Sequence, residues 1–459
     1  MKGGVVERFE EEIKEYARSR GVDIVGVAGP DRLSGPPSLD PAYTMKGARS
    51  IVSMALPMDV EAIYAFLSKE TPTPHNLDQL LGNQRMRSCC EQVAGFIRSR
   101  GHRAEVVPPN NTYRRSLDVF STRPGFSHRF GAIAAGVGAQ GWSGNVMTAE
   151  HGAAVYLGTV VTEAVLESDP PLNPRHFVDG PCRSCKVCAQ TCVACMFEPE
   201  GEEYVLLNGE LHPRAKRNGL DLCNASCFGL HSISPERTWS TWGKHWIEDW
   251  VGRRPSGGKL ALRLALMRRG GTTGDATPRY DLIRRNGALL QPRELLDRLP
   301  RPGEAMAEDR AGSNRLLMEN ARATGVLGVE RLRDPNVLTC GHCALVCGPT
   351  VAETKRRLEA LHSGGIVVPG EAPDEMVKVK DYAEALEVMG RRSHRVKRRA
   401  MRWDGLQSAW LWHRYYFGFE PRSFFGGIAY GLRLRRAVRE GAPGRGLRSA
   451  AGRGDGKID

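Results

Sequence analysis

Apolar residues recur at helical spacing in some parts of the chain and form short continuous runs in others. The opening segment predicts an amphipathic helix that ends at Gly21, and residues 23–27 predict a short strand. The run "SIVSMALPM" predicts a buried strand, residues 85–99 predict a second helix, and "GHRAEVVPP" predicts a turn followed by a strand. Because strands and helices alternate, we expect an α/β layer structure with some parallel pairing. Residues 351–390 are expected to be helical.

Composition sets the broad class. The chain has 459 residues, of which 41% are hydrophobic and 25% charged, as is ordinary for a globular protein with several domains. No signal-peptide pattern, twin-arginine pattern or run of about eighteen apolar residues occurs. We therefore expect a cytoplasmic protein, in which clustered cysteines indicate metal binding or catalysis rather than disulfides.

Five of the twelve cysteines lie within "CRSCKVCAQTCVAC", and a second group lies in "CGHCALVC". The first group has the spacing Cys-x2-Cys-x2-Cys-x3-Cys of bacterial two-cluster ferredoxins, in which the fourth thiolate binds the other [4Fe–4S] cluster. Tetrahedral zinc is the alternative, but zinc does not need such a run. Two clusters require eight ligands. The first is assigned Cys182, Cys185, Cys188 and Cys347, and the second Cys192, Cys223, Cys340 and Cys343. Cys227 could replace Cys223, and Cys195 receives no role.

Two other features, the cysteine pair Cys89 and Cys90 and a glycine-rich stretch, can be explained without a bound cofactor. Cys89 and Cys90 lie on a predicted helix with no further cysteine nearby, so burial in the core is favoured over metal binding. Residues 131–145, "GAIAAGVGAQGWSGN", contain five glycines. Their GxGxxG spacing does not follow a predicted strand, so a flexible turn and a cofactor loop are both open.

Several of these segments resemble two related families of corrinoid enzymes. "CRSCKVCAQTC" and "CGHCALVCGP" resemble the iron–sulfur motifs of corrinoid-dependent reductive dehalogenases. "FSHRFGAIAAGVGAQGWSGN" is similar to the stretch beside the cobalamin in those enzymes and in epoxyqueuosine reductases. The resemblance covers about residues 5–230 and 334–350, and the chain is closer to the dehalogenases.

The resemblance implies a fold and its cofactors. It implies an α+β or α/β architecture, with a nitroreductase-like cobalamin-binding domain at 1–175 and a two-[4Fe–4S] ferredoxin-like domain at 176–350. An insertion would occupy about 229–335, and 351–459 would be a basic, helical C-terminal region. Electrons would pass through both clusters to the cobalamin. Six residues of the glycine stretch are the implied corrinoid contacts: Gly136, Gly138, Gly141, Trp142, Gly144 and Asn145.

The resemblance also implies a proton donor. Epoxyqueuosine reductases carry an acidic residue where this chain has Ser121, and the twin-arginine leader of exported dehalogenases does not occur. Dehalogenases are thought to use a tyrosine beside a basic residue, which makes Tyr113 with Arg114 the first candidate. His128 and Arg129 are second candidates. The alternatives are a surface loop position for Tyr113 and a structural hydrogen bond for His128.

The last feature is a basic, aromatic tail. Residues 391–459 hold 17 of the 65 lysines and arginines but only 5 of the 52 acidic residues, so most of the net charge of +13 belongs to this segment. This composition fits four roles: a solvated charged face, peripheral contact with a membrane, RNA binding, or packing of the aromatic residues on the core. Of the two partners, RNA is less favoured than a membrane.

The function expected from the sequence is a cobalamin-dependent iron–sulfur reductase that cleaves a carbon–halogen or other carbon–heteroatom bond of a small molecule. Its electron donor would be a low-potential ferredoxin or flavodoxin. The alternatives are an electron-transfer protein without corrinoid catalysis and a reductase that modifies transfer RNA.

Overall fold

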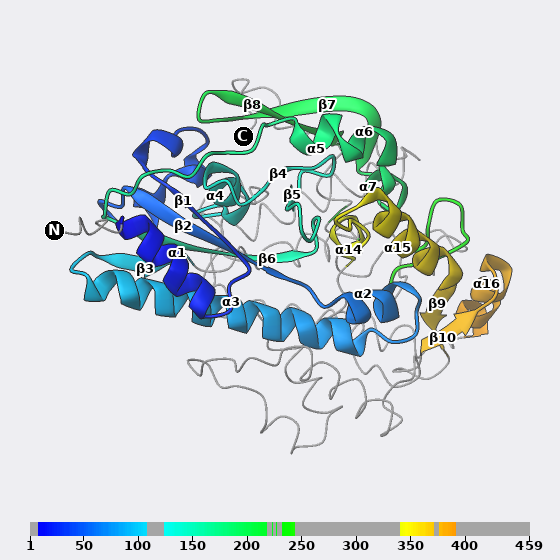
Figure 1. The fold of residues 1–459 in the computed structure, drawn as a ribbon. Helices are drawn as coiled ribbons and strands as arrows, with labels where there is room; N and C mark the ends of the chain where they lie inside the picture. Colours follow the sequence, from blue (N-terminus) through cyan, green and yellow to red (C-terminus); the bar gives the residue numbers. More distant parts are fainter. Residues whose placement is uncertain are drawn as a thin grey trace, which may run out of the picture.

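A computed structural model describes residues 8–107, 124–217, 223, 226, 232–243, 340–370 and 376–391. These residues form a mixed α/β fold in which a sheet with its helices stands beside a second region built around the cysteines (Figure 1). The C-terminal tail and most of the predicted insertion lie outside the described residues. No helix of the described part is both long and apolar enough to cross a membrane.

The central sheet has four strands in the order β1-β2-β6-β3. Every neighbouring pair is antiparallel, so the expected parallel pairing is wrong for these strands. The cause is the connectivity: the chain returns from the first strand to the second through short 3-10 helices instead of a crossover helix, and the third strand pairs at the far edge. The bounds of the strands are β1 (Ile24–Ala28), β2 (Ser50–Pro57), β3 (Ala104–Val106) and β6 (Val155–Thr162), and those of the 3-10 helices are η1 (Pro30–Arg32), η2 (Pro37–Leu39) and η3 (Pro41–Tyr43).

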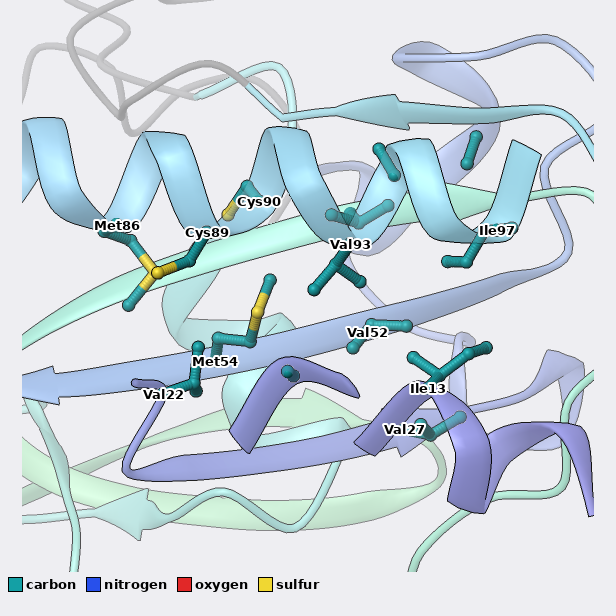
Figure 2. Packing of buried hydrophobic residues seen from close by; sticks show 14 of the residues in the cluster. Ile13, Val22, Val27, Val52, Met54, Met86, Cys89, Cys90, Val93 and Ile97 are labelled. Atoms are coloured by element: carbon teal, nitrogen blue, oxygen red, sulfur yellow. The ribbon is translucent and has the colours of Figure 1, made fainter. Parts of the chain in front are cut away.

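Helices cover both faces of this sheet, which explains why β2 is apolar at consecutive positions. On one face, α1 (Phe9–Ser19) and α3 (Thr73–Ser99) pack through Ile13, Val93 and Ile97 (Figure 2). Cys89 and Cys90 belong to this core, as predicted. On the other face lies α4 (His128–Ala134), whose Ala132 and Ile133 belong to a second buried cluster.

The cysteine-rich region consists of short helices around a hairpin. The hairpin turns at Asn208 and Gly209, which have φ angles of +49° and +78°, as expected of a tight two-residue turn. In Figure 1, α14 lies beside α7 and α15. The bounds are β4 (Ala139–Gln140), β5 (Val146–Met147), α5 (His176–Asp179), α6 (Pro181–Cys185), α7 (Val187–Gln190), β7 (Phe197–Leu207), β8 (Glu210–Arg217) and α14 (His342–Leu345).

Residues 351–390 are not helical throughout, which corrects the prediction from sequence. The helix α15 (Val351–Ser363) ends before Gly364 and Gly365, and the β-branched residues that follow pair as the hairpin of β9 (Ile366–Pro369) and β10 (Met376–Val379). Their apolar side chains pack against α16 (Tyr382–Arg391). On its other side α15 contacts α2 (Val60–Leu67), which joins this region to the end of β2.

Candidate metal centre

The structure brings the two cysteine motifs together although they are far apart in sequence. Helix α14, which carries Cys343, contacts α7, which carries Cys188. The backbone amide of Ala153 donates a hydrogen bond to the carbonyl of Cys347 over 3.1 Å. Cys182 is buried in the same apolar cluster against which Cys188 and Cys347 pack. The second motif therefore lies against the first.

Four of the predicted ligands, Cys182, Cys185, Cys188 and Cys347, influence one another's titration, and Cys343 acts on one of them. Burial raises the pKa of Cys188 well above its usual value, and negative charge on Cys347, Cys343, Cys182 and Cys185 raises it further. Burial likewise raises the pKa of Cys347 to about 12, with Cys182 and Cys185 acting in the same direction. For Cys182, burial raises the pKa to about 11, the amide of Trp142 opposes this, and Cys185 adds to it. Cys182 and Cys185 thus act on both Cys188 and Cys347, and Cys347 also acts on Cys188.

The remaining predicted ligands are only partly connected in the described residues. Burial raises the pKa of Cys192 to about 11; a hydrogen bond from the backbone amide of Met196 lowers it, and the charge of Cys343 raises it. Cys223 and Cys343 pack against the same apolar cluster. The inclusion of Cys340 and Cys223 with this pair stays a prediction, and Cys227 lies outside the described residues.

The donor set suits an iron–sulfur cluster. Thiolates are the ligands that bind [4Fe–4S] clusters, and no carboxylate is among the main influences on Cys188 and Cys347 from the part of the chain that the structure describes. Among the described residues, no three Cys, His, Asp or Glu side chains are arranged to hold a single metal ion. In a cluster each thiolate binds a different iron, so four thiols around a common centre are the relevant arrangement. The residues fit the predicted group.

Cys195 lies next to the predicted ligand Cys192, and its charge raises the pKa of that thiol. Its side chain is exposed, its φ is +46°, and its backbone amide donates to the carbonyl of Cys192. Burial raises its pKa, and the nearby Glu236 adds to the effect.

The glycine stretch lies against the cysteines, but its glycines approach the protein itself. A Cβ atom on Gly136 would lie 2.5 Å from the carbonyl oxygen of Pro170, and one on Gly138 would lie 2.3 Å from that of Met147. Gly141 faces the sulfur of Met147. These glycines therefore make room for neighbouring segments, and their predicted contact with a corrinoid stays a prediction.

The last residues of the stretch join it to the cysteines. Trp142 is buried, its backbone bonds to the thiol of Cys182, and the ammonium of Lys186 lies 4.5 Å from the centre of its ring. Asn145 is also buried, and its Nδ2 donates to the sulfur of Cys343 over 3.4 Å. Gly144 has a φ of +73° and borders Arg217, whose Nη2 donates to the carbonyl of Ser143 over 2.9 Å.

The predicted catalytic residues lie in different surroundings. His128 is buried, and its Nδ1 lies 2.8 Å from the hydroxyl oxygen of Thr159, which matches the structural alternative. Arg129 is exposed and lies close enough to Arg217 for its charge to lower the pKa of that guanidinium. Tyr113, Arg114 and Ser121 lie outside the described residues.

Sequence reasoning missed the basic residues near the second motif. Lys69 is wholly buried near Cys340, and Arg217 acts on Cys343 from the end of β8. Lys69 follows α2 without any motif around it, and Arg217 stands in an ordinary charged run, "HPRAKRNG". Of the basic residues near this motif, His342 is the one whose position in the sequence, between Cys340 and Cys343, indicates that it lies close to the cysteines.

No family model and no curated protein matches the chain. Reductive dehalogenases and epoxyqueuosine reductases, the two families that the sequence resembles, are among the solved structures to which the chain is similar. A reductive dehalogenase structure that suggests a mechanism for B12-dependent dehalogenation is 16% identical over 49% of this chain and 30% of its own, with a TM-score of 0.38. The catabolic reductive dehalogenase NpRdhA in complex with 3-bromo-4-hydroxybenzoic acid is 16% identical over 47% of this chain and 29% of its own, with a TM-score of 0.37.

The epoxyqueuosine reductase of Bacillus subtilis is 16% identical over 92% of this chain and 98% of its own, with a TM-score of 0.33. This chain thus spans less than a third of these two dehalogenase chains, but nearly all of this epoxyqueuosine reductase.

Proposed function

We propose that this chain is an iron–sulfur reductase that uses two [4Fe–4S] clusters and a cobalamin to cleave a carbon–halogen or other carbon–heteroatom bond of a small molecule. One observation supports the iron–sulfur part above all. The charges of Cys182 and Cys185 act on Cys188 of the same motif and on Cys347, which comes from the other motif. A scaffold without a metal has no need to bring these thiols together, because deprotonated thiols repel each other and protonated ones are weak hydrogen-bond partners.

The chain's own residues would hold the groups as follows. Cys182, Cys185, Cys188 and Cys347 bind the first cluster, and a second set binds the other, consisting of Cys192, Cys223, Cys340 and Cys343. When bound, the clusters supply one-electron transfer and the corrinoid supplies the reductive chemistry at the substrate. Asn145 and the amide of Met196 donate hydrogen bonds to the sulfurs of Cys343 and Cys192 and so orient them. A ferredoxin or flavodoxin is the proposed electron donor.

A second candidate is an electron-transfer protein that binds the clusters but no corrinoid. The packing of Gly136, Gly138 and Gly141 against the protein's own atoms favours it, because the small size of these glycines then needs no cofactor to explain it. The corrinoid part of the first proposal depends on the sequence resemblance.

Anaerobic purification followed by iron, sulfide and corrinoid analysis tests the proposal. We expect about eight irons per chain and a bound corrinoid. Cys347→Ser should lose about four irons, whereas Cys195→Ser, which changes the exposed thiol without a predicted role, should keep all of them.

The outcomes separate the candidates. Iron and sulfide without corrinoid, after reconstitution with cobalamin, would favour the electron-transfer protein. Zinc in place of iron, or equal iron contents in the two cysteine variants, would contradict both.

A further inference from the structure

Three aromatic rings join the second cysteine motif to the surface of the protein. They belong to His342, which stands between Cys340 and Cys343, to Trp239, and to His362 in the last turn of α15. The ring centres of Trp239 and His342 lie 6.0 Å apart at an interplanar angle of 22°, and those of Trp239 and His362 lie 6.1 Å apart at 21°. Aromatic rings attract each other at such distances. His342 and Trp239 are buried whereas His362 is exposed, so the stack runs from the interior to solvent.

The inner end of the stack contacts a predicted cluster ligand. The Nδ1 of His342 lies 2.6 Å from the carbonyl oxygen of Cys340 and 3.5 Å from the sulfur of the same residue. Since a carbonyl only accepts hydrogen bonds, this nitrogen carries the proton and donates it to Cys340. The imidazole ring is therefore in direct contact with a residue that is proposed to bind a cluster.

Hydrogen bonds of the backbone hold the middle ring in place. The amide of Ser234 donates to the carbonyl of Trp239 over 2.9 Å, and the amide of Trp239 donates to the hydroxyl of Ser234 over 3.4 Å. The amide of the next residue, Ser240, donates to the carbonyl of Gly365 over 3.1 Å. Because Gly365 follows α15 closely, these bonds tie the loop that carries Trp239 to the segment next to His362.

Packing alone does not account for the inner histidine. Trp239 belongs to a buried apolar cluster with Phe66, Leu361 and Val367, in which an apolar side chain would fill the place of His342 at lower cost. The Nε2 of His342 is buried and has no hydrogen-bond partner in the part of the chain that the structure describes. Keeping a polar ring at this position is unfavourable for folding, which points to a role beyond stability.

The outer end of the stack is suited to a brief contact with an acidic partner. The exposed Lys378 donates from its Nζ to the carbonyl of Ser68 over 3.4 Å, and a Cβ atom on Gly364 would lie 2.8 Å from the carbonyl carbon of Ser68. An ammonium therefore lies beside the segment that follows His362. Ferredoxins and flavodoxins, the proposed electron donors, have acidic surfaces, and electron-transfer contacts are small and guided by charge.

We propose that electrons enter the protein along the stack of His362, Trp239 and His342, and that the electron donor docks over His362. One electron leaves the reduced cofactor of a ferredoxin or flavodoxin and is taken up by the cluster that Cys340 binds. No bond forms or breaks, and the rings are not reduced: they are the medium through which the electron tunnels, and tunnelling is faster through packed atoms than across gaps. The inference rests on the proposed function, because it requires a cluster at Cys340.

Stopped-flow reduction of the anaerobic holoprotein tests the route, with the loss of cluster absorbance as the readout. Reduced flavodoxin is the protein donor, and dithionite is a small reductant that needs no docking surface. His362→Glu places a negative charge where the acidic donor docks. We expect reduction by flavodoxin at low salt to become about tenfold slower, and reduction by dithionite to stay the same.

The middle ring is tested at saturating flavodoxin, where docking no longer limits the rate. Trp239→Leu keeps an apolar side chain but removes the ring, so it should lower this limiting rate, whereas Trp239→Phe keeps a ring and should retain most of it. Iron analysis of each variant shows whether its clusters are intact. Because His362 is exposed, His362→Glu remains a valid test if Trp239→Leu does not fold.

His176→Glu is the matched control, because His176 is an exposed histidine on α5, which contacts the helix that carries Cys182 of the first motif. It should keep the wild-type rates with both reductants. The inference is overturned if His176→Glu slows reduction by flavodoxin and His362→Glu does not, if His362→Glu slows both reductants equally, or if Trp239→Leu with intact clusters keeps the wild-type rate. A wild-type protein without iron after reconstitution overturns the proposed function itself, and iron analysis distinguishes that case.

Discussion

The side-chain amide of Asn145 donates a hydrogen bond to the sulfur of Cys343 over 3.4 Å and joins the glycine stretch to the second cysteine motif. The two residues belong to segments that are predicted from the sequence as separate sites. Because Asn145 is buried, this donor has few other partners, and a bond from an amide to a sulfur stabilises negative charge on that sulfur. The glycine stretch thus contributes to the environment of the cysteines whether or not it also contacts a corrinoid.

Replacing Asn145 by leucine should lower the reduction potential of the cluster that Cys343 binds. The variant keeps the volume but loses the N–H donor, and a hydrogen bond of about 1 kcal/mol corresponds to roughly 40 mV for a one-electron couple. Redox titration measures the shift. Ser143→Ala is the control, because Ser143 accepts from the backbone of Asn145 but does not contact the cysteine. An equal shift in both variants would mean that the loop conformation, rather than the donated hydrogen bond, sets the potential.

Gly152 should be required for the position of Cys347. Its φ is +61°, and a Cβ atom there would lie 2.4 Å from the carbonyl oxygen of Gly348 and 2.5 Å from that of Cys347. Gly152→Ala would push this backbone away, so we expect the loss of about four irons per chain in an iron assay.

The control for this prediction is Gly21→Ala. Gly21 has a similar φ of +81°, but a Cβ atom there would have no other atom within 4 Å, so the substitution introduces backbone strain of about 1 kcal/mol without a collision. Iron loss in both variants would attribute the effect to general destabilisation, and full iron in Gly152→Ala would contradict the prediction.

Gly138→Ala tests whether the glycine stretch is needed for packing alone. The added Cβ would lie 2.3 Å from the carbonyl oxygen of Met147, at the point where β4 pairs with β5, and we expect the protein to lose at least about 2 kcal/mol of stability even without any corrinoid. Chemical denaturation of the cofactor-free protein measures this loss. In Gly390→Ala, where nothing lies within 4 Å and the site is helical, stability should stay the same or rise slightly. An unchanged stability of Gly138→Ala would restore the interpretation of this glycine as one that faces a ligand.

Local patterns predicted much of the fold, because they report which residues are buried. The helix that ends before Gly21, the apolar run of β2, and the burial of Cys89 and Cys90 all follow from periodicity and composition. Strand direction did not follow, because consecutive apolar positions indicate only that both faces are covered, which antiparallel strands also achieve here. The hairpin of β9 and β10 was not predicted, because its short β-branched runs lie between two segments with helical periodicity, and the whole region was expected to be helical.

The sequence predicts candidate ligands for the site but not the charges around them. Cysteine spacing depends on cluster geometry, so it is visible in the sequence, whereas Lys69 and Arg217 reach the cysteines only through tertiary packing. Lysine is so common on surfaces that a single one carries no signal of burial. The same limit applies to His128, whose contact with Thr159 depends on how α4 packs against β6.

Arg357 should stabilise the position of α14 more than its neighbour Arg356 does. The side chain of Arg357 is 3% exposed, bonds to Glu353, and donates to the carbonyl of Leu345 over 3.1 Å, whereas the side chain of Arg356 is 67% exposed and bonds to the same carboxylate. Arg357→Met should cost about 3 kcal/mol, because it leaves a buried carbonyl and part of a carboxylate without partners. Arg356→Met should change stability little, since water screens that pair. Chemical denaturation at neutral pH compares the two, and equal losses would contradict the prediction.

The pH dependence provides a second measurement of the same pair. Burial alone would raise the pKa of Glu353, but the hydrogen bonds from Arg356 and Arg357 outweigh it and hold this pKa below the ordinary value of 4.5. A carboxylate of this kind contributes stability above pH 4.5 that is lost as the pH falls through the lowered folded-state pKa. The wild type should therefore lose stability more steeply than Arg357→Met below that pH, because the variant has less of this contribution to lose. Parallel curves for the two proteins would show that Arg357 acts through the carbonyl of Leu345 and not through its charge.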